Sequence, residues 1–308
     1  MIGEATVVNC PACGATHTET VFTGTEDRFG LGGSFPVRRC LGCSFLWTEL
    51  PKGFDLADWY ERGYWQSDDD GQPDAVPARA RRFWRAWNGS PRPSRWIKSG
   101  RVLDLGCGPA YDSAEMLAEG ALPIGVDTSR GALIMAGQKH VTGLQASAER
   151  LPLSDACIDA VVMSQVLEHM PEPRAVLAEA TRVLKPGGRI LILLPNSGSL
   201  QRRLFDTDWV NWHLPYHLWH FSAATLRTML AKTDIEVTSC RSVSPGEWLL
   251  LSAVRRWPRL ALLGKQRYQS LLVRACVAPA LRLTDACGAG DCLVIEGRKA
   301  FESQRGGT

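Results

Sequence analysis

The run from Arg101 to Asp112, RVLDLGCGPAYD, sets an acid and two glycines within a few residues. Glycine lets a ligand approach the backbone closely because it carries no side chain. A dinucleotide fingerprint would need a third glycine where Tyr111 stands, and a P-loop would need a following Gly-Lys-Ser or Gly-Lys-Thr, which is missing. The loop is therefore predicted to hold an adenosine ligand without phosphates.

Two carboxylates flank this loop. Asp104 stands near the tip of the first expected strand, close enough to meet a cationic amino group. Asp127 ends the second expected strand, about 20 residues beyond the loop, where a carboxylate can accept both hydroxyls of a ribose. An acid for each end of the ligand, with glycines between them, is what S-adenosylmethionine requires.

Four cysteines form two Cys-x-x-Cys pairs, Cys10 with Cys13 and Cys40 with Cys43. Two such pairs supply four thiolates, which can complete a tetrahedral shell around one ion, and zinc is the ion that this donor set suits. Disulfide chemistry is the alternative, since a single pair can do it. Four thiolates leave no ligand position open, so we predict a structural Zn²⁺ ion.

From Arg101 onward, short apolar segments alternate with segments of helical periodicity. This alternation predicts parallel strands joined by crossover helices. In open sheets of this class the ligand lies at the carboxyl ends of the strands, near the point where the strand order reverses. The glycine loop and both carboxylates are expected at that edge.

Five short motifs follow one another in this part of the chain: VLDLGCG, GVD, AERLPLSDACIDAVVMSQVLEHM, which counts as two, and RVLKPGGRILILLPN. In this order they resemble the class I S-adenosylmethionine-dependent methyltransferases, over Arg101 to about Lys299. The resemblance implies an α/β fold, a Rossmann-like seven-stranded and mostly parallel sheet with helices on both faces. It also implies methyl transfer with S-adenosylmethionine as cofactor.

The same resemblance implies contacts along the cofactor. The methionine moiety would lie along Gly106, Cys107 and Gly108, in addition to the contact expected from Asp104. Asp127 would hold the ribose, and Ala148 and Glu149 would flank the adenine. Gln165 would lie near the sulfonium. Ser147 departs from the pattern, because many members have an Asp there that contacts the adenine amino group.

The N-terminal part resembles a zinc-ribbon-like module that precedes a Tyr…Tyr segment, here WYERGYW, in a subset of these enzymes. Members of that subset often act in the biosynthesis of sugars, surface polysaccharides and secondary metabolites, which implies a small-molecule or glycosyl acceptor. The expected organisation is a zinc-binding module (1–50), a helical connector (51–100) and a methyltransferase domain (101–300) with a lid (201–222) and a helical insert (246–286).

Methyl transfer from a sulfonium mainly needs aligned reactants and a site that excludes water. A base is required only where the acceptor must lose a proton, and histidine is the usual one near neutral pH. The candidates are His217, in the expected lid beside His213 and His220, and His169, after the fourth strand. The alternative is that these histidines only hydrogen-bond a loop into shape.

An RNA methyltransferase is a rival hypothesis, because residues 79–101 interleave basic and aromatic side chains as an RNA-binding surface does. Against nucleic acid as acceptor, SQVLEHM stands where enzymes that methylate base amines carry an Asn-Pro-Pro-Tyr type of sequence. A second rival binds the cofactor without turning it over. The intact first motif and Asp127 favour catalysis.

The start, MIGEATVVNC, lacks the charged and apolar regions of a signal peptide, and no apolar run approaches the roughly 18 residues that cross a bilayer. We therefore expect a cytoplasmic protein. Residues 247–284 are leucine-rich and basic, as in amphipathic helices that lie on anionic membranes. The alternative is an insert packed on its own domain or on a second copy of the chain, as a homodimer.

Overall fold

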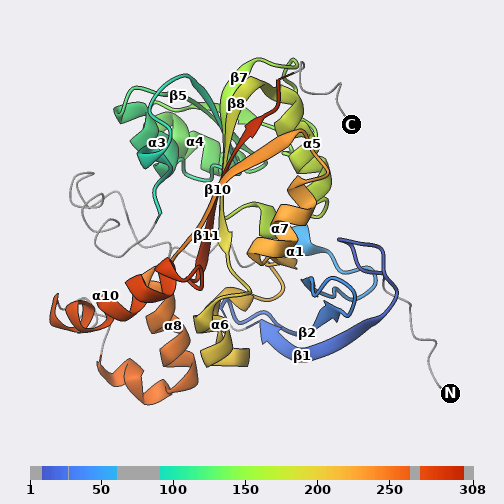
Figure 1. Ribbon diagram of the computed structural model, residues 1–308, viewed down its shortest axis with the longest axis vertical. Coiled ribbons are helices and arrows are strands. Elements are labelled where there is room, and N and C mark those ends of the chain that lie inside the picture. Colours follow the sequence, from blue (N-terminus) through green and yellow to red (C-terminus); the bar gives the residue numbers. More distant parts are fainter. Residues whose placement is uncertain (1–8, 27, 61–90, 264–270, 302–308) are drawn as a thin grey trace.

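The computed structural model describes residues 9–26, 28–60, 91–263 and 271–301 (Figure 1). Residues 61–90, which hold most of the predicted connector and most of its basic and aromatic side chains, lie outside the described residues. The described parts form two β-sheets with helices around them.

The larger sheet has seven strands in the order β10-β11-β8-β7-β4-β5-β6. β11 runs antiparallel to both of its neighbours, and the other strands are parallel to one another. The strand order reverses between β4 and β7, which confirms the predicted α/β fold class. The strands are β4 (Arg101–Leu105), β5 (Leu122–Asp127), β6 (Thr142–Gln145), β7 (Ile158–Ser164), β8 (Leu184–Pro195), β10 (Ile235–Val243) and β11 (Cys292–Lys299).

Both faces of this sheet are buried because successive apolar side chains point to opposite faces. Val102 and Leu103, which follow one another in β4, belong to different core clusters. Figure 1 shows helices on both sides of the sheet. They are α3 (Tyr111–Ala118) and α4 (Arg130–Gln138) on one side, and α5 (Pro173–Val183) and α7 (Ala223–Leu230) on the other.

Three of these helices begin at residues suited to a helix start. The Ser129 hydroxyl accepts a hydrogen bond from the Ala132 N–H at the start of α4. Ser222 and Thr225 form a capping box at the start of α7, and α5 begins with Pro173. The first N–H groups of a helix have no partner inside the helix. The serine side chains accept hydrogen bonds from such groups, and a proline at the helix start removes one of them.

The smaller sheet joins two parts of the chain that are distant in sequence. Its antiparallel strands are β1 (Thr18–Glu26), β2 (Gly32–Cys40), β3 (Leu46–Thr48) and β9 (Trp219–His220). β9 comes from the segment expected to form the lid. The Phe45 ring lies 6.0 Å from the Trp219 ring and 5.4 Å from the Phe221 ring. The cysteine-bearing module is thus built together with the segment 201–222.

The remaining helical elements are short or lie in the expected insert. They are α1 (Leu56–Trp59), η3 (Pro93–Arg95), η4 (Leu167–His169), α6 (Leu200–Phe205), η5 (Asp206–Asp208), η6 (Val210–Trp212), α8 (Gly246–Arg256), η7 (Pro258–Leu263) and α10 (Leu271–Ala286). Among the helices that the structure describes, none combines the length and the apolar character needed to span a bilayer.

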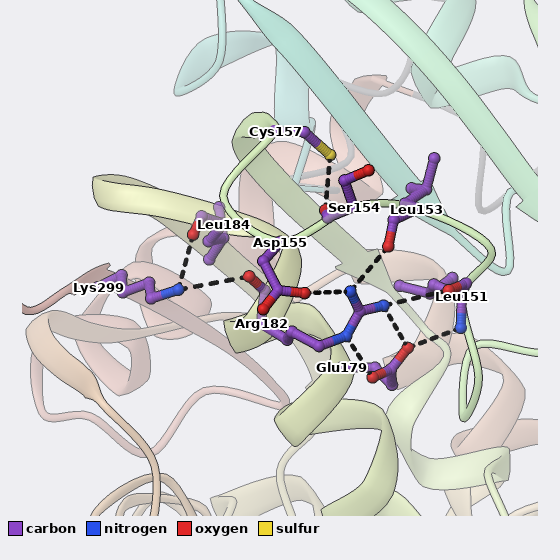
Figure 2. A network of polar contacts seen from close by, with 9 residues as sticks. All are labelled: Leu151, Leu153, Ser154, Asp155, Cys157, Glu179, Arg182, Leu184 and Lys299. Carbon is purple, nitrogen blue, oxygen red and sulfur yellow. Dashed lines mark hydrogen bonds and ion pairs between the residues drawn. The ribbon is translucent and has the colours of Figure 1, made fainter.

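Arg182 organises the edge of the sheet where the parallel strands begin (Figure 2). Its guanidinium donates to the Leu153 carbonyl, to Asp155 and to Glu179, each at 2.7 Å. Lys299 closes the same edge from β11 by donating to the Leu184 carbonyl at 2.8 Å. A hollow of about 490 Å³ lies beside this network. Because it opens at the edge opposite the expected cofactor site, it is not the catalytic cleft.

Candidate active site

Gly106 and Gly108 form the turn after β4, and both have positive φ, 62° and 50°. A Cβ at Gly106 would lie 2.8 Å from the Val166 side chain, so packing requires a glycine there. A Cβ at Gly108 would meet no described atom within 4 Å. The backbone at Gly108 therefore borders open space, as a ligand that approaches this loop requires.

Asp127 holds this loop from the end of β5. One carboxylate oxygen accepts from the Gly108 N–H at 2.9 Å, and the other accepts from the Ser129 N–H at 2.8 Å. The side chain is only 9% exposed. Each carboxylate oxygen can accept a second hydrogen bond. Asp127 could therefore hold two ribose hydroxyls while it fixes the loop.

The Asp104 carboxylate is buried rather than exposed at the surface of the predicted cofactor site. It is 3% exposed, and it accepts a hydrogen bond from the Ser113 hydroxyl at 2.6 Å. Burial raises its pKa to about 7, and the nearby carboxylates of Asp112 and Asp127 contribute to that rise. An incoming ammonium group would favour the ionised form of Asp104.

Cys107 uses its thiol for packing. A Cβ at Gly125 in β5 would lie 2.6 Å from the Cys107 sulfur, so the thiol occupies the space that the glycine leaves. Burial is the main cause that raises the pKa of this thiol. The part of Cys107 that could line the cofactor is therefore its backbone.

The predicted adenine and sulfonium residues lie at the same edge of the sheet, after β6 and β7. Ala148 is buried, and the Glu149 carboxylate accepts from the Glu172 N–H at 3.1 Å, just before α5. The Ser147 hydroxyl accepts from the Glu149 N–H at 3.2 Å, so it shapes this loop. Gln165 has φ 58° and stands directly after β7. The edge thus gathers the whole predicted cofactor set.

The four predicted zinc ligands lie together. The Cys10 and Cys43 sulfurs are 3.6 Å apart, as are those of Cys13 and Cys40, and all four lie within 4.8 Å of one another. A tetrahedral ion with Zn–S bonds of about 2.3 Å would separate its sulfurs by about 3.8 Å. The arrangement fits one zinc ion.

The pKa values of Cys10, Cys40 and Cys43 also favour a metal ion at this cluster. Burial raises the pKa of Cys10 and of Cys43. At Cys40 burial also raises the pKa, but N–H donors from Cys43 and Gly42 outweigh it and lower the value to about 7. Thiols packed this closely cannot all ionise without a cation between them, which a metal ion would supply.

The structure brings the two candidate bases, His169 and His217, into contact. Their ring centroids are 4.6 Å apart, and the His213 ring packs against His217 at 4.8 Å. Burial lowers the pKa of His169 to about 4 and that of His217 well below 6.5. Both rings are therefore neutral at physiological pH and are weak bases. A neutral imidazole is the form that can accept a proton, so general-base catalysis by His217 or His169 stays a prediction.

Two further residues at this cluster were not predicted from the sequence. The Tyr60 hydroxyl lies 2.7 Å from Nδ1 of His169. Glu168 is 1% exposed, and burial raises its pKa to about 8. The signal available in the sequence was only that Glu168 precedes His169 and that Tyr60 stands in WYERGYW. Neither feature of the sequence predicts that Glu168 is buried beside His169.

The segment 213–220 closes this edge by pairing with the residues after β7. The Leu218 N–H donates to the Glu168 carbonyl at 2.8 Å, and the Trp219 ring N–H donates to the Met170 carbonyl at 2.6 Å. On its other side the Thr48 hydroxyl donates to the His217 carbonyl at 2.6 Å. The segment is therefore held between β7 and the smaller sheet.

Comparison with known proteins supports the identification of a methyltransferase domain in this chain. Residues 103–192 match the family described as "Methyltransferase domain". The demethylmenaquinone methyltransferase of Clavibacter sepedonicus is 43% identical over 97 residues, which cover 30% of this chain and 40% of that protein. The protein of the same name from Mycolicibacterium paratuberculosis is 29% identical over 184 residues, 59% of this chain and 72% of the relative. The first relative is thus matched over less than half of its length.

A solved structure extends the likeness of fold beyond the matched family segment. It is described as a "complex between the Haloferax volcanii Trm112 methyltransferase activator and the putative methyltransferase", with a TM-score of 0.54 and 17% sequence identity. The likeness covers 80% of this chain and 99% of that one. At this identity it supports the fold alone.

Proposed function

We propose that this chain, which carries a class I S-adenosylmethionine-dependent methyltransferase domain, transfers the methyl group of that cofactor to a small-molecule acceptor. The observation that carries the proposal is the Asp127 carboxylate, which fixes the glycine loop while its oxygens can still accept from a ribose. The open space at Gly108 supports the same placement of the cofactor.

When bound, S-adenosylmethionine supplies an electrophilic methyl group on a sulfonium. The backbone of Gly106, Cys107 and Gly108 would line the methionine moiety, and Asp127 would orient the ribose. Asp104 would balance the ammonium charge, and Gln165 would lie near the sulfonium. Such positioning is the main contribution that an enzyme makes to an in-line displacement.

The segment 206–222 would exclude water from the acceptor side of this site. Its buried members include Trp209, Trp212 and Tyr216, and its histidines are neutral. A dry, largely apolar wall strengthens the electrostatic contacts inside it and prevents side reactions. This placement supports a role for the segment in enclosing the acceptor.

We propose that Cys10, Cys13, Cys40 and Cys43 hold a structural Zn²⁺ ion. The sulfur separations fit a tetrahedral ion, and four thiolates leave no position for a substrate. The ion would fix the turns that lead into β1 and β3, and through β3 it would fix β9.

A small organic molecule is the acceptor class that the relatives support, since they are named demethylmenaquinone methyltransferases. A glycosyl intermediate, implied by the resemblance of the zinc module, falls in the same class of small acceptors. RNA is the alternative acceptor. The assay below separates these three.

We also propose that the acceptor is met at a membrane surface. Large apolar side chains are exposed on or next to two helices that contact each other, α6 and α8: Leu200, Leu204, Leu251 and Trp257. Exposed arginines, Arg203 and Arg256, stand beside them. Apolar and basic side chains on one surface suit an anionic lipid interface.

Calorimetry on the full-length, zinc-loaded protein tests cofactor binding directly. We expect S-adenosylmethionine and its demethylated product to bind wild type, and the Asp127→Asn variant to bind about tenfold more weakly or worse. Its amide –NH₂ would face a backbone N–H, and a hydrogen bond to a charged group is worth about 1.5–3 kcal/mol. Asp234→Asn, an exposed change at the opposite edge, is the matched control and should bind as wild type does.

Incubation with methyl-labelled cofactor then tests transfer. The acceptors offered are a demethylated quinone, nucleotide-linked sugars and total RNA, and mass spectrometry locates the label. Label in a small acceptor supports the proposal, and label only in RNA contradicts it. A protein that binds neither form of the cofactor contradicts the methyltransferase function itself.

A further inference from the structure

Glu168, His169 and His217 form a cluster where the segment 206–222 crosses the end of β7. One potential ligand atom from each lies within 4.8 Å of the other two. Glu168 is 1% exposed, and neither of its carboxylate oxygens has a hydrogen-bonding partner on another residue that the structure describes. Its own backbone N–H lowers its pKa, but burial raises that pKa by more. A buried carboxylate without a partner is rare, because its lost hydration must be replaced by hydrogen bonds or by a cation.

In each of the two histidines a backbone carbonyl fixes which ring nitrogen carries the proton. Nδ1 of His217 lies 2.7 Å from the Asn211 carbonyl, and Nδ1 of His169 lies 2.9 Å from the Tyr216 carbonyl. A carbonyl only accepts, so each Nδ1 must carry the proton. The Tyr60 hydroxyl, 2.7 Å from Nδ1 of His169, is then a second acceptor for that proton. Each Nε2 therefore carries a lone pair. Metal-binding histidines are commonly oriented in this way by backbone carbonyls.

His213 does not belong to this donor set. Its Nε2 lies 3.3 Å from a guanidinium nitrogen of Arg28. Arginine can only donate, so Nε2 of His213 is the acceptor in that contact. The set is thus two imidazoles and one carboxylate, which leaves positions around an ion for further oxygen ligands.

We propose that Glu168, His169 and His217 form a second metal site, which binds one divalent transition-metal ion of the zinc or iron(II) type. Two histidines and a carboxylate are ligands that both ions accept with coordination positions left open. This donor set lacks sulfur, so the site is chemically distinct from the four cysteines. The ion would supply the positive charge that the buried carboxylate otherwise lacks.

The position of the cluster suggests a use for the open positions. Glu168 stands three residues after Gln165, at the strand end where the sulfonium is expected. An ion there could hold an acceptor oxygen in line with the methyl group and favour its deprotonated form. This role rests on the proposed methyl transfer, whereas the metal site itself does not.

Cobalt(II) is the probe for this site in the full-length protein. The cysteines are first loaded with one equivalent of Zn²⁺, and Co²⁺ is then added and followed by absorption and by metal analysis after desalting. We expect one bound Co²⁺ with a spectrum free of thiolate-to-metal charge transfer. Glu168→Gln and His217→Asn should each weaken Co²⁺ binding about tenfold or more, because even the loss of a supporting group costs that much.

Three controls make the outcome decisive. His140→Asn replaces an exposed histidine whose positive φ asparagine tolerates, and it should bind Co²⁺ as wild type does. Cys13→Ser should lose zinc at the cysteines and keep the second equivalent. Circular dichroism and melting curves check that each variant is folded, and the two ligand variants serve as independent tests.

The proposal is overturned if zinc-loaded wild type takes up no second equivalent of Co²⁺, Zn²⁺ or Fe²⁺. It is also overturned if folded Glu168→Gln and His217→Asn bind Co²⁺ as tightly as wild type. Because metal uptake is measured without cofactor or acceptor, a failure of the proposed methyl transfer leaves this result unaffected, and the two failures can be told apart.

Discussion

Asp291 is a single carboxylate that fixes the segment crossing the cofactor edge. It is fully buried and accepts from the Ser199 hydroxyl at 2.6 Å, the Trp209 ring N–H at 2.8 Å and the Asn211 side-chain amide at 3.1 Å. Burial raises its pKa to about 7, and the three donors only partly offset that rise. One side chain thus ties the start of α6 and the residues after it to the strand β11.

Replacing Asp291 with Ala should destabilise the protein by about 3 kcal/mol or more, because three buried donors lose their acceptor. Urea unfolding measures the change in the free energy of unfolding. Asp234→Asn, at an exposed position, should change it by less than about 0.5 kcal/mol. A loss below about 1 kcal/mol for Asp291→Ala would mean that water or other residues satisfy the donors.

His220 makes stability depend on pH. It is 4% exposed, and its Nε2 lies 3.0 Å from the Thr48 hydroxyl. That hydroxyl gives its proton to the His217 carbonyl, so Nε2 of His220 must be the donor. Burial lowers its pKa to about 3, and the nearby charge of Arg202 adds to the shift.

A histidine whose pKa is lower in the folded state stabilises the protein above its unfolded pKa, near 6.5. This contribution is lost as the pH falls from about 6.5 toward 3. We expect wild type to lose about 2 kcal/mol through His220 between about pH 7 and pH 5, a loss that His220→Gln lacks. Urea unfolding at several pH values compares the two, and parallel pH profiles would contradict the assignment.

Residue spacing could predict only part of the site. The cysteine set was predictable because Cys-x-x-Cys constrains both sulfurs to one turn, and the glycine loop because few ligands suit its pattern. The isolation of the Glu168 carboxylate was not predictable. Glu168 is buried, and no local sequence pattern encodes that burial. Its cluster with His217 was also not predictable, because His217 lies far along the chain.

At the scale of elements, the pairing of β3 with β9 couples the cysteine cluster to the cofactor edge. Leu46 pairs with His220, and Trp47 pairs with Trp219. Phe45, between the Cys43 turn and β3, packs against Trp219 and Phe221. A change at the cysteines should therefore be felt in the segment 213–222.

Removal of zinc by a chelator should raise the hydrogen exchange of backbone amides in β3 and β9 together. The physical reason is that the turns at Cys10 and Cys40 lose the ion that holds them, and β3 begins a few residues beyond the second turn. Hydrogen exchange with mass spectrometry measures this. Cys13→Ser should show the raised exchange before chelation, and β4 should be unaffected in both proteins.

Protection that changes in β3 but not in β9 would contradict the coupling.

The pairing of β3 with β9 could not be predicted from sequence patterns. The apolar runs of β4, β7 and β8 predict strands because they are long enough to show a pattern. β9 has two residues, and its partner lies in another module, so nothing in its own sequence distinguishes it from a loop.

At the scale of the molecule, α6 and α8 lie away from the edge where the parallel strands begin (Figure 1). Both helices carry exposed apolar side chains. Trp257, at the end of α8, is 51% exposed. Phe301 is similarly exposed, at 55%, but it follows β11 at that opposite edge. Substitutions at Trp257 and Phe301 can therefore compare membrane binding through α8 with binding through the opposite edge of the sheet.

Full-length protein should float with vesicles that contain phosphatidylserine and remain at the bottom with neutral vesicles. Trp257→Glu should weaken this binding about fivefold, because one charge near an anionic surface is worth about 1 kcal/mol. Phe301→Glu should leave it unchanged. Equal loss in both variants, or no flotation of wild type, would contradict membrane contact through α6 and α8.

The shared sheet also restricts how such a chain can be recombined. A chimera that exchanges only residues 1–50 would graft a foreign β3 onto the native β9, and the mismatch would fall within the segment 206–222. A workable exchange must carry residues 206–222 along with the cysteine module. The cysteine module and the segment 206–222, which we propose encloses the acceptor, are thus expected to be inherited together.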